Sequence, residues 1–121
     1  MARVLIADDA TFVRKVVSEM VVAAGHTVVA EAANGEEAVD LYDELRPDIA
    51  LLDVNMPGLD GLAAAERIRL TYPTARIILA SVLMSESRIR QAIAITQTAP
   101  LQKPFDAAQL AAALQAAEAG R

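Results

Sequence analysis

The chain has 121 residues, a net charge of −5 and no cysteine, and its aromatic residues are two tyrosines and two phenylalanines. This length suits one domain with one hydrophobic core, and no apolar stretch approaches the roughly 20 residues of a membrane span. Without cysteines there are no disulfides or thiolate metal sites, which agrees with a cytoplasmic location, and the scattered basic residues give no support to nucleic-acid binding.

The first half of the chain alternates short apolar runs with segments of helical periodicity. In chain order the pattern predicts a strand at 3–7, a helix at 11–24, a strand at 27–31, a helix at 36–45 and a strand at 49–52. Thr11 is the expected cap of the first helix and Gly25 its end. Pro47 prevents the second helix from continuing.

The second half repeats the alternation. It predicts a helix at 59–71, a strand at 76–81, a helix at 85–95, a short strand at 98–101 and a helix from Asp106, as its cap, to about Glu118. The residues expected to face inward are Leu62, Ala65 and Ile68, with Leu70 as a further candidate, on the first of these helices, and Ile89 and Ile93 on the second.

Five strand–helix units with short connections predict an α/β fold of one domain over residues 1–121. Units of this kind form a doubly wound parallel sheet with right-handed crossovers and helices on both faces. Ligands of such folds bind beyond the carboxyl ends of the strands. Functional side chains are therefore expected where the strands end.

Three acidic residues follow predicted strands. Asp8 and Asp9 end the first strand, and Asp53 ends the third, just before a turn that contains Pro57 and Gly58. One of the first two acids could simply cap the next helix, but Thr11 competes for that role. Mg²⁺ prefers hard oxygen ligands and uses a few carboxylates together with water and phosphate oxygens. The three acids together therefore predict a magnesium site.

Two further polar residues end strands at the same side of the predicted sheet. Lys103, taken alone, could be an ordinary surface lysine, and Ser81 an ordinary hydroxyl at the end of a strand. Beside three carboxylates, Lys103 would supply a counter-charge, and Ser81 could donate a hydrogen bond to a phosphoryl oxygen. The set predicts a site for magnesium and a phosphoryl group.

This pattern resembles the receiver domain of two-component response regulators, along the whole chain. The matching residues are Asp8-Asp9, Asp53 within the run D-V-N-M-P-G-L-D-G, Ser81 and Lys103-Pro104-Phe105. The segments at 8–14 and 28–35 are especially similar to stand-alone chemotaxis response regulators. The resemblance implies a flavodoxin-like (βα)5 fold with strand order 2-1-3-4-5, for which a member of this family is a standard example.

The resemblance also implies a role for each matching residue. Asp53 would be the phosphoacceptor, and Asp8, Asp9, Asp53 and the backbone carbonyl of Asn55 would hold Mg²⁺. Lys103 would pair with Asp53 and then with the phosphoryl group, and Ser81 would hydrogen-bond that group after transfer. The chain would be no enzyme beyond catalysing its own phosphorylation and dephosphorylation.

The expected partners are a histidine kinase or phosphotransfer protein as donor and a downstream protein, such as a flagellar switch, as target. No nucleic acid or membrane partner is expected, and the chain is expected to be a monomer or weak dimer. The kinase, the stimulus, the target and the lifetime of the phosphorylated state do not follow from the sequence.

Two other functions stay open at this point. A small Mg²⁺-dependent aspartyl phosphatase would need a second acid two residues after the nucleophile, where this chain has Asn55, which cannot act as an acid. A degenerate receiver, acting as an interaction module without phosphorylation, is favoured only by Pro100. That proline replaces the aromatic residue that the family usually has three positions before the lysine, and it is compatible only with an edge strand.

Overall fold

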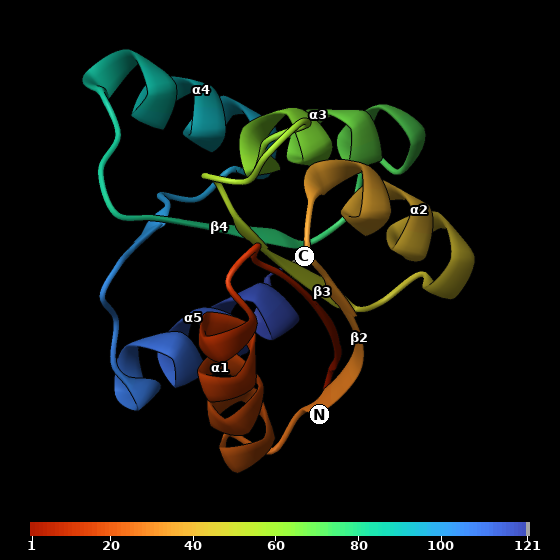
Figure 1. The fold of residues 1–121 in the computed structure, drawn as a ribbon, viewed down its shortest axis with the longest axis vertical. Helices are drawn as coiled ribbons and strands as arrows, with labels where there is room; N and C mark the ends of the chain where they lie inside the picture. The colour runs from red at the N-terminus through yellow and green to blue at the C-terminus, as the bar shows by residue number, and fades with distance from the viewer. Residues whose placement is uncertain (121) are drawn as a thin grey trace.

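The computed structural model describes residues 1–120, in which strands and helices alternate along the chain (Figure 1). The strands are β1 (Arg3–Ala7), β2 (Thr27–Ala32), β3 (Ile49–Asp53), β4 (Ile77–Ser81) and β5 (Leu101–Gln102). The helices are α1 (Thr11–Ala23), α2 (Gly35–Leu45), α3 (Gly61–Thr71), α4 (Glu86–Thr96) and α5 (Ala107–Ala119). Within residues 1–120, no helix has the length and apolar character needed to cross a membrane.

The strands form one parallel sheet in the order β2-β1-β3-β4-β5, which confirms the predicted fold and strand order. Because every strand runs in the same direction, their carboxyl ends lie along one edge of the sheet. β1 and β3 are the central pair, with Ala7 of β1 beside Leu52 of β3. Asp8, which follows β1, and Asp53, the last residue of β3, therefore come close together although 45 positions separate them in the chain.

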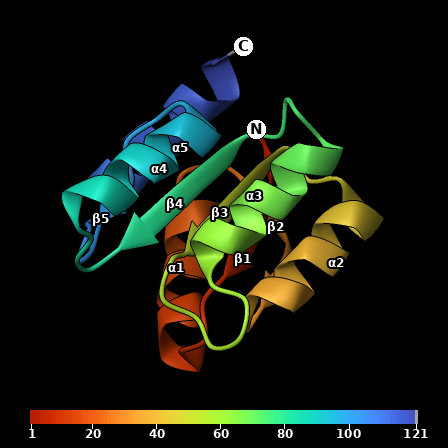
Figure 2. The same cartoon turned by 90° about the horizontal axis from the view of Figure 1, so that it is seen from above.

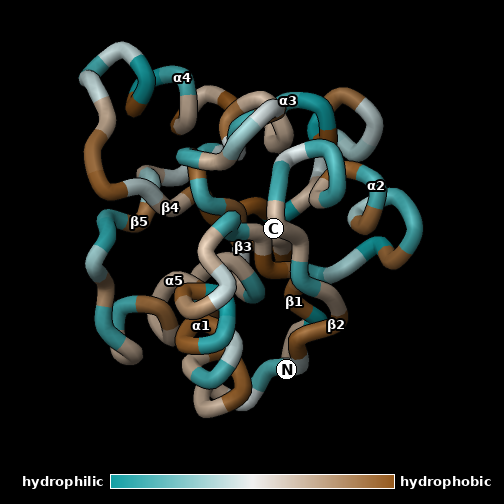
Figure 3. The backbone as a smooth tube through the Cα atoms, in the orientation of Figure 1, coloured by the Kyte–Doolittle hydropathy of each residue, from teal (hydrophilic) through white to brown (hydrophobic). Residues whose placement is uncertain are grey.

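Each face of the sheet has its own hydrophobic core, because successive strand residues point to opposite faces. In β1, Leu5 contributes to the core under α2, α3 and α4, whereas Val4 and Ile6 contribute to the core under α1 and α5. Figures 1 and 2 show these helices on the two sides of the sheet, and Figure 3 shows the hydrophobic colouring of the strands between them. The two cores fix the sheet on which the acidic residues are placed.

Most helices begin with a side-chain cap. The side-chain oxygens of Asn34, Asp60, Ser85 and Asp106 each accept a hydrogen bond from the backbone three residues later. The prediction for Asp106 is confirmed, but that for Thr11 is wrong. Thr11 is the first residue of α1, and the cap position holds Ala10, whose side chain cannot accept a hydrogen bond.

Three other expectations from the sequence were wrong, all in the second half of the chain. The strand predicted at 98–101 begins only at Leu101, because Pro100 has no backbone N–H for a ladder hydrogen bond. Leu70 is 79% exposed and Ile93 is 42% exposed, so neither faces inward. In α4 the inward positions are Ala92 and Thr96. Small residues there let α4 lie close to the sheet while the isoleucine turns outward.

Candidate functional site

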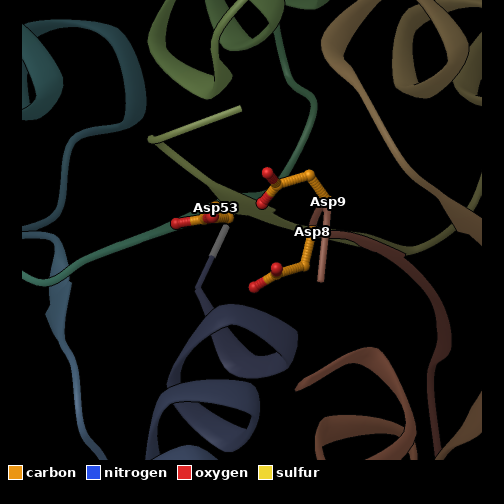
Figure 4. A group of neighbouring side chains, drawn as sticks. All are labelled: Asp8, Asp9 and Asp53. Carbon is orange, nitrogen blue, oxygen red and sulfur yellow. The ribbon is translucent and has the colours of Figure 1, made fainter. Parts of the chain in front are cut away.

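The acidic site lies beyond the carboxyl ends of β1 and β3. One carboxylate oxygen from each of Asp8, Asp9 and Asp53 lies within 4.8 Å of the others. Figure 4 shows the three side chains leaving the two strands and extending toward the same side. Asp8 and Asp53 are buried, at 5% and 7% exposure, whereas Asp9 is exposed. The structure thus brings together all three acids that the sequence singled out.

Lys103 connects two of these acids. Its Nζ lies 2.7 Å from Asp8 Oδ2 and 3.3 Å from Asp53 Oδ1. The lysine is held in place by the sheet, because its backbone N–H donates to the carbonyl of Ser81 over 2.8 Å and so continues the β4–β5 ladder. A β5 of two residues is therefore sufficient to deliver the ammonium group to the carboxylates.

Burial and neighbouring charges shift the pKa of two groups in this site, Asp53 and Lys103. Burial raises the pKa of Asp53, the positive charge of Lys103 acts against this shift, and the neighbouring Asp8 carboxylate adds to it. For Lys103, burial favours the neutral amine, but the hydrogen bond to Asp8 and the charge of Asp53 outweigh burial and raise its pKa. Lys103 is therefore an ammonium group at neutral pH, and ionisation of Asp53 is costly even with that ammonium group beside it.

Ser81 and Asn55 form the other side of the site. The Asn55 side-chain amide donates to Ser81 Oγ over 3.4 Å, and the Asn55 backbone N–H lies 3.4 Å from Asp53 Oδ1. Ser81 Oγ in turn donates to the Leu83 carbonyl over 3.3 Å. The serine hydroxyl therefore links the acidic turn after β3 to the loop after β4.

Gly61 allows the turn after β3 to be this tight. A Cβ atom at this position would lie 2.1 Å from the carbonyl oxygen of Asp53, far inside contact distance. Its backbone N–H donates to the Val54 carbonyl over 3.0 Å, so α3 begins directly against the end of β3. Gly61 is not among the predicted site residues, although it ends the run D-V-N-M-P-G-L-D-G that begins with Asp53.

The ligands present fit a hard divalent cation. The donors are carboxylate oxygens, and no histidine or cysteine belongs to the cluster found in residues 1–120. This set suits Mg²⁺, which takes a small number of carboxylates and leaves room for water and phosphate oxygens. A surface cavity of about 1080 Å³ lies elsewhere, lined by residues such as Arg69, Arg76 and Pro100 and by none of the acidic residues. The candidate site is therefore the open edge of the sheet.

Comparisons with known proteins identify the family of the chain. The family model of the response regulator receiver domain matches residues 4–115. The chemotaxis protein CheY of Listeria monocytogenes is 40% identical over 117 residues, which cover 97% of this chain and 98% of the relative.

Two solved structures are similar throughout. A LuxR-family two-component response regulator from Aurantimonas has a TM-score of 0.92 and 34% identity, covering 100% of this chain and 87% of that one. CheY in a complex with CheX, BeF3 and magnesium from Borrelia burgdorferi has a TM-score of 0.89 and 30% identity, covering 94% of this chain and 87% of that one.

Proposed function

Because the chain belongs to the family of response regulator receiver domains, we propose that it accepts a phosphoryl group on Asp53 and signals through the resulting change at its surface. The observation that carries this proposal is the contact of one ammonium group, that of Lys103, with both Asp8 and Asp53. Asp8 and Asp9 would hold Mg²⁺ together with Asp53 and the backbone carbonyl of Asn55. Residues 1–121 would form a single receiver domain.

The main difficulty of the reaction is the approach of two negative groups. An Asp53 oxygen would form the new O–P bond while the P–N bond of a donor phosphohistidine breaks, its electron pair returning to the imidazole nitrogen. A bound Mg²⁺ would neutralise charge on the phosphoryl oxygens. Lys103 offers a second positive charge, already in place 3.3 Å from Asp53 Oδ1. Such prepositioned charge is the dominant contribution to catalysis of phosphoryl transfer.

Ser81 supplies the way in which phosphorylation would alter the surface. Its hydroxyl can donate one hydrogen bond, and in this structure it donates to the Leu83 carbonyl. To donate to a phosphoryl oxygen, it must give up that bond. Val82 and Leu83 are 61% and 85% exposed, so little packing holds the loop after β4 in its present conformation. The loop is therefore free to follow the hydroxyl, which is how a new charge can bias a two-state element.

The donor would be a histidine kinase or a phosphotransfer protein, and the output would pass to a partner protein. A role in chemotaxis, with a flagellar switch as target, is supported by the similarity to CheY of Listeria monocytogenes along nearly the whole of both chains. The likeness to a LuxR-family regulator supports the receiver function equally well without chemotaxis. The chain would be a phosphoacceptor rather than an enzyme that turns over a separate substrate.

Incubation with Mg²⁺ and acetyl phosphate, followed by intact-mass measurement, tests the proposal. We expect one phosphoryl group per chain, lost in Asp53→Asn and kept in Asp40→Asn, which removes an exposed carboxylate elsewhere. Rapid consumption of acetyl phosphate without an adduct would instead identify a phosphatase. No reaction at all would identify a receiver that works without phosphorylation.

A further inference from the structure

Arg14 joins three parts of the molecule directly behind the acidic site. It lies on α1, and its Nη1 donates to the backbone carbonyl of Asp8 over 2.6 Å. Its Nε lies 3.3 Å from Glu31 Oε1 near the carboxyl end of β2. Only 16% of the Arg14 side chain is exposed. None of these contacts involves a carboxylate of the acidic site, so Arg14 acts on the backbone that carries Asp8 and Asp9.

The turn from Asp8 to Ala10 has few other anchors. Ala10 occupies the cap position of α1 and offers no side-chain oxygen. The Ala10 N–H instead donates to Asp8 Oδ1 over 2.9 Å, which uses an oxygen of a proposed metal ligand. The other Asp8 carboxylate oxygen, Oδ2, contacts Lys103 Nζ over 2.7 Å. The backbone of the turn is bonded at the Asp8 N–H, which donates to the Ala32 carbonyl over 3.0 Å, and at the Ala10 carbonyl, which accepts from the Arg14 N–H over 3.0 Å. The Asp8 carbonyl accepts from the Arg14 side chain. Of the bonds to Asp8, the two at its backbone do not depend on what its carboxylate binds.

We propose that Arg14 is a positioning residue for the metal-binding turn, and that by fixing the Asp8 carbonyl it directs the Asp8 and Asp9 carboxylates toward a shared divalent cation. This inference rests on the proposed function, because it assumes that the acids bind a cation. It assigns to Arg14 a role that no feature of the sequence indicated. Glu31 would act differently, because its negative charge, 3.3 Å from Arg14 Nε, would offset part of the positive charge of Arg14.

The charge of Arg14 makes this inference testable by the sign of an effect. A positive group near a cation site weakens cation binding by repulsion. If Arg14 acted only through its charge, its removal would tighten Mg²⁺ binding. If Arg14 positions the turn, its removal weakens binding in spite of the more favourable charge. The two roles thus predict changes in opposite directions.

The experiment is a calorimetric titration of the intact chain with MgCl2, without any phosphodonor. We expect Arg14→Gln to weaken Mg²⁺ binding about tenfold, the lower end of the effect of lost outer contacts at metal sites. Lys15→Gln is the matched control, since it removes the same charge from the next, exposed position of α1. It should leave the affinity unchanged or slightly higher. Equal or tighter binding by Arg14→Gln would overturn the proposal.

Two further measurements separate positioning from a general loss of stability. NMR spectra of the metal-free protein should show the Asp8 and Asp9 amide signals displaced in Arg14→Gln and not in Lys15→Gln. If Arg14→Gln does not fold, Arg14→Lys takes its place, because an ammonium group cannot make both contacts of the planar guanidinium. We then expect weaker Mg²⁺ binding than in the wild type, and unchanged affinity would equally overturn the proposal.

The outcome also distinguishes this inference from the proposed function. A wild-type chain that does not bind Mg²⁺ would contradict the proposed function and this inference together. A wild-type chain that binds Mg²⁺, with Arg14→Gln binding it equally well, would contradict only the inference. Glu31→Gln should weaken binding less than Arg14→Gln, since the bond to the Asp8 carbonyl remains in that variant.

Discussion

Two regions of the molecule are built very differently: the centre of the sheet, formed by β1 and β3, and its edge, formed by β5 and the loop after β4. Every residue of β3 is buried, and β1 and β3 each pair with strands on both sides. At the edge, β5 has two residues, and the loop after β4 exposes Val82 and Leu83. Packing thus fixes Asp8 and Asp53 in the centre, whereas the loop after β4 makes little hydrophobic contact with the rest of the molecule.

The two regions contribute different parts of the proposed site. The centre supplies the acids Asp8 and Asp53. The edge places Lys103, and the loop after β4 begins at Ser81. A single ladder bond, from the Lys103 N–H to the Ser81 carbonyl, places the lysine. We therefore expect that a change of sequence at the edge, for example at Pro100, leaves the acidic site undisturbed. The following predictions test that independence.

The largest effect is expected for Gly61→Ala, which strikes the centre directly. Its Cβ would lie 2.1 Å from the Asp53 carbonyl oxygen, so β3 and α3 must move apart. We expect a loss of about 3 kcal/mol in the free energy of unfolding, measured in urea, and a lower yield of the phosphoryl adduct.

Gly25→Ala is the control for Gly61→Ala, because a Cβ at Gly25 meets nothing within 4 Å and only its positive φ of 91° opposes the change. It should cost about 1 kcal/mol and leave the adduct unchanged. If the two variants lost the same stability, the close approach of α3 to β3 would not be what constrains the centre.

The next effect concerns the contact between edge and centre, through Lys103→Met. Removing the ammonium group leaves the buried Asp8 and Asp53 carboxylates facing each other without a positive charge. We expect the metal-free protein to lose about 2 kcal/mol of unfolding free energy at neutral pH. Mg²⁺ should bind more tightly than to the wild type and restore much of the loss.

Urea unfolding with EDTA and with MgCl2 measures both effects of Lys103→Met. Lys15→Met serves as the control, because Lys15 is an exposed lysine without an ion pair in residues 1–120. Equal stability of Lys103→Met and wild type in EDTA would show that the lysine does not relieve the repulsion between the acids.

The sequence predicted the centre better than the edge for a physical reason. Apolar runs that end in Asp8 and Asp53 indicate buried parallel strands, and parallel strands place both acids together at their carboxyl ends. The extent of β5 and the outward turn of Ile93 depend on how closely α4 packs, which periodicity does not describe. Arg14 was missed because its partners, the Asp8 carbonyl and Glu31, are brought to it only by the fold.

A smaller effect, opposite in sign, is expected for Asp53→Asn. Burial raises the pKa of Asp53 in the folded state above its ordinary value of 3.8, so the folded protein binds this proton more tightly than the unfolded chain does. Ionisation of Asp53 therefore destabilises the fold as the pH rises through and above that value. The neutral asparagine avoids this cost and should stabilise the metal-free protein at pH 7 by on the order of 1 kcal/mol.

The gain from Asp53→Asn should disappear below about pH 3, where the aspartate is protonated in both states. Urea unfolding in EDTA across this pH range measures it, with Asp40→Asn, which removes an exposed carboxylate, as the control. A less stable Asp53→Asn at pH 7 would mean that the attraction of Lys103 for Asp53 exceeds the cost of burial.

The smallest effect is expected at the edge, for Pro100→Tyr, which introduces the aromatic residue usual in the family. Pro100 lies just outside the β4–β5 pairing, which joins Ala80 to Leu101 and Ser81 to Gln102. Loss of the proline ring gives the unfolded chain more freedom, so we expect a decrease of at most about 1 kcal/mol in the free energy of unfolding. The amount of phosphoryl adduct formed from acetyl phosphate should not change, since Lys103 keeps its bond to the Ser81 carbonyl.

Pro100→Ala separates the loss of the ring from the gain of the aromatic side chain, and its stability and adduct yield should match those of Pro100→Tyr. A clear change in adduct yield in Pro100→Tyr alone would show that the edge acts back on the centre, and the independence of the two regions would then be wrong.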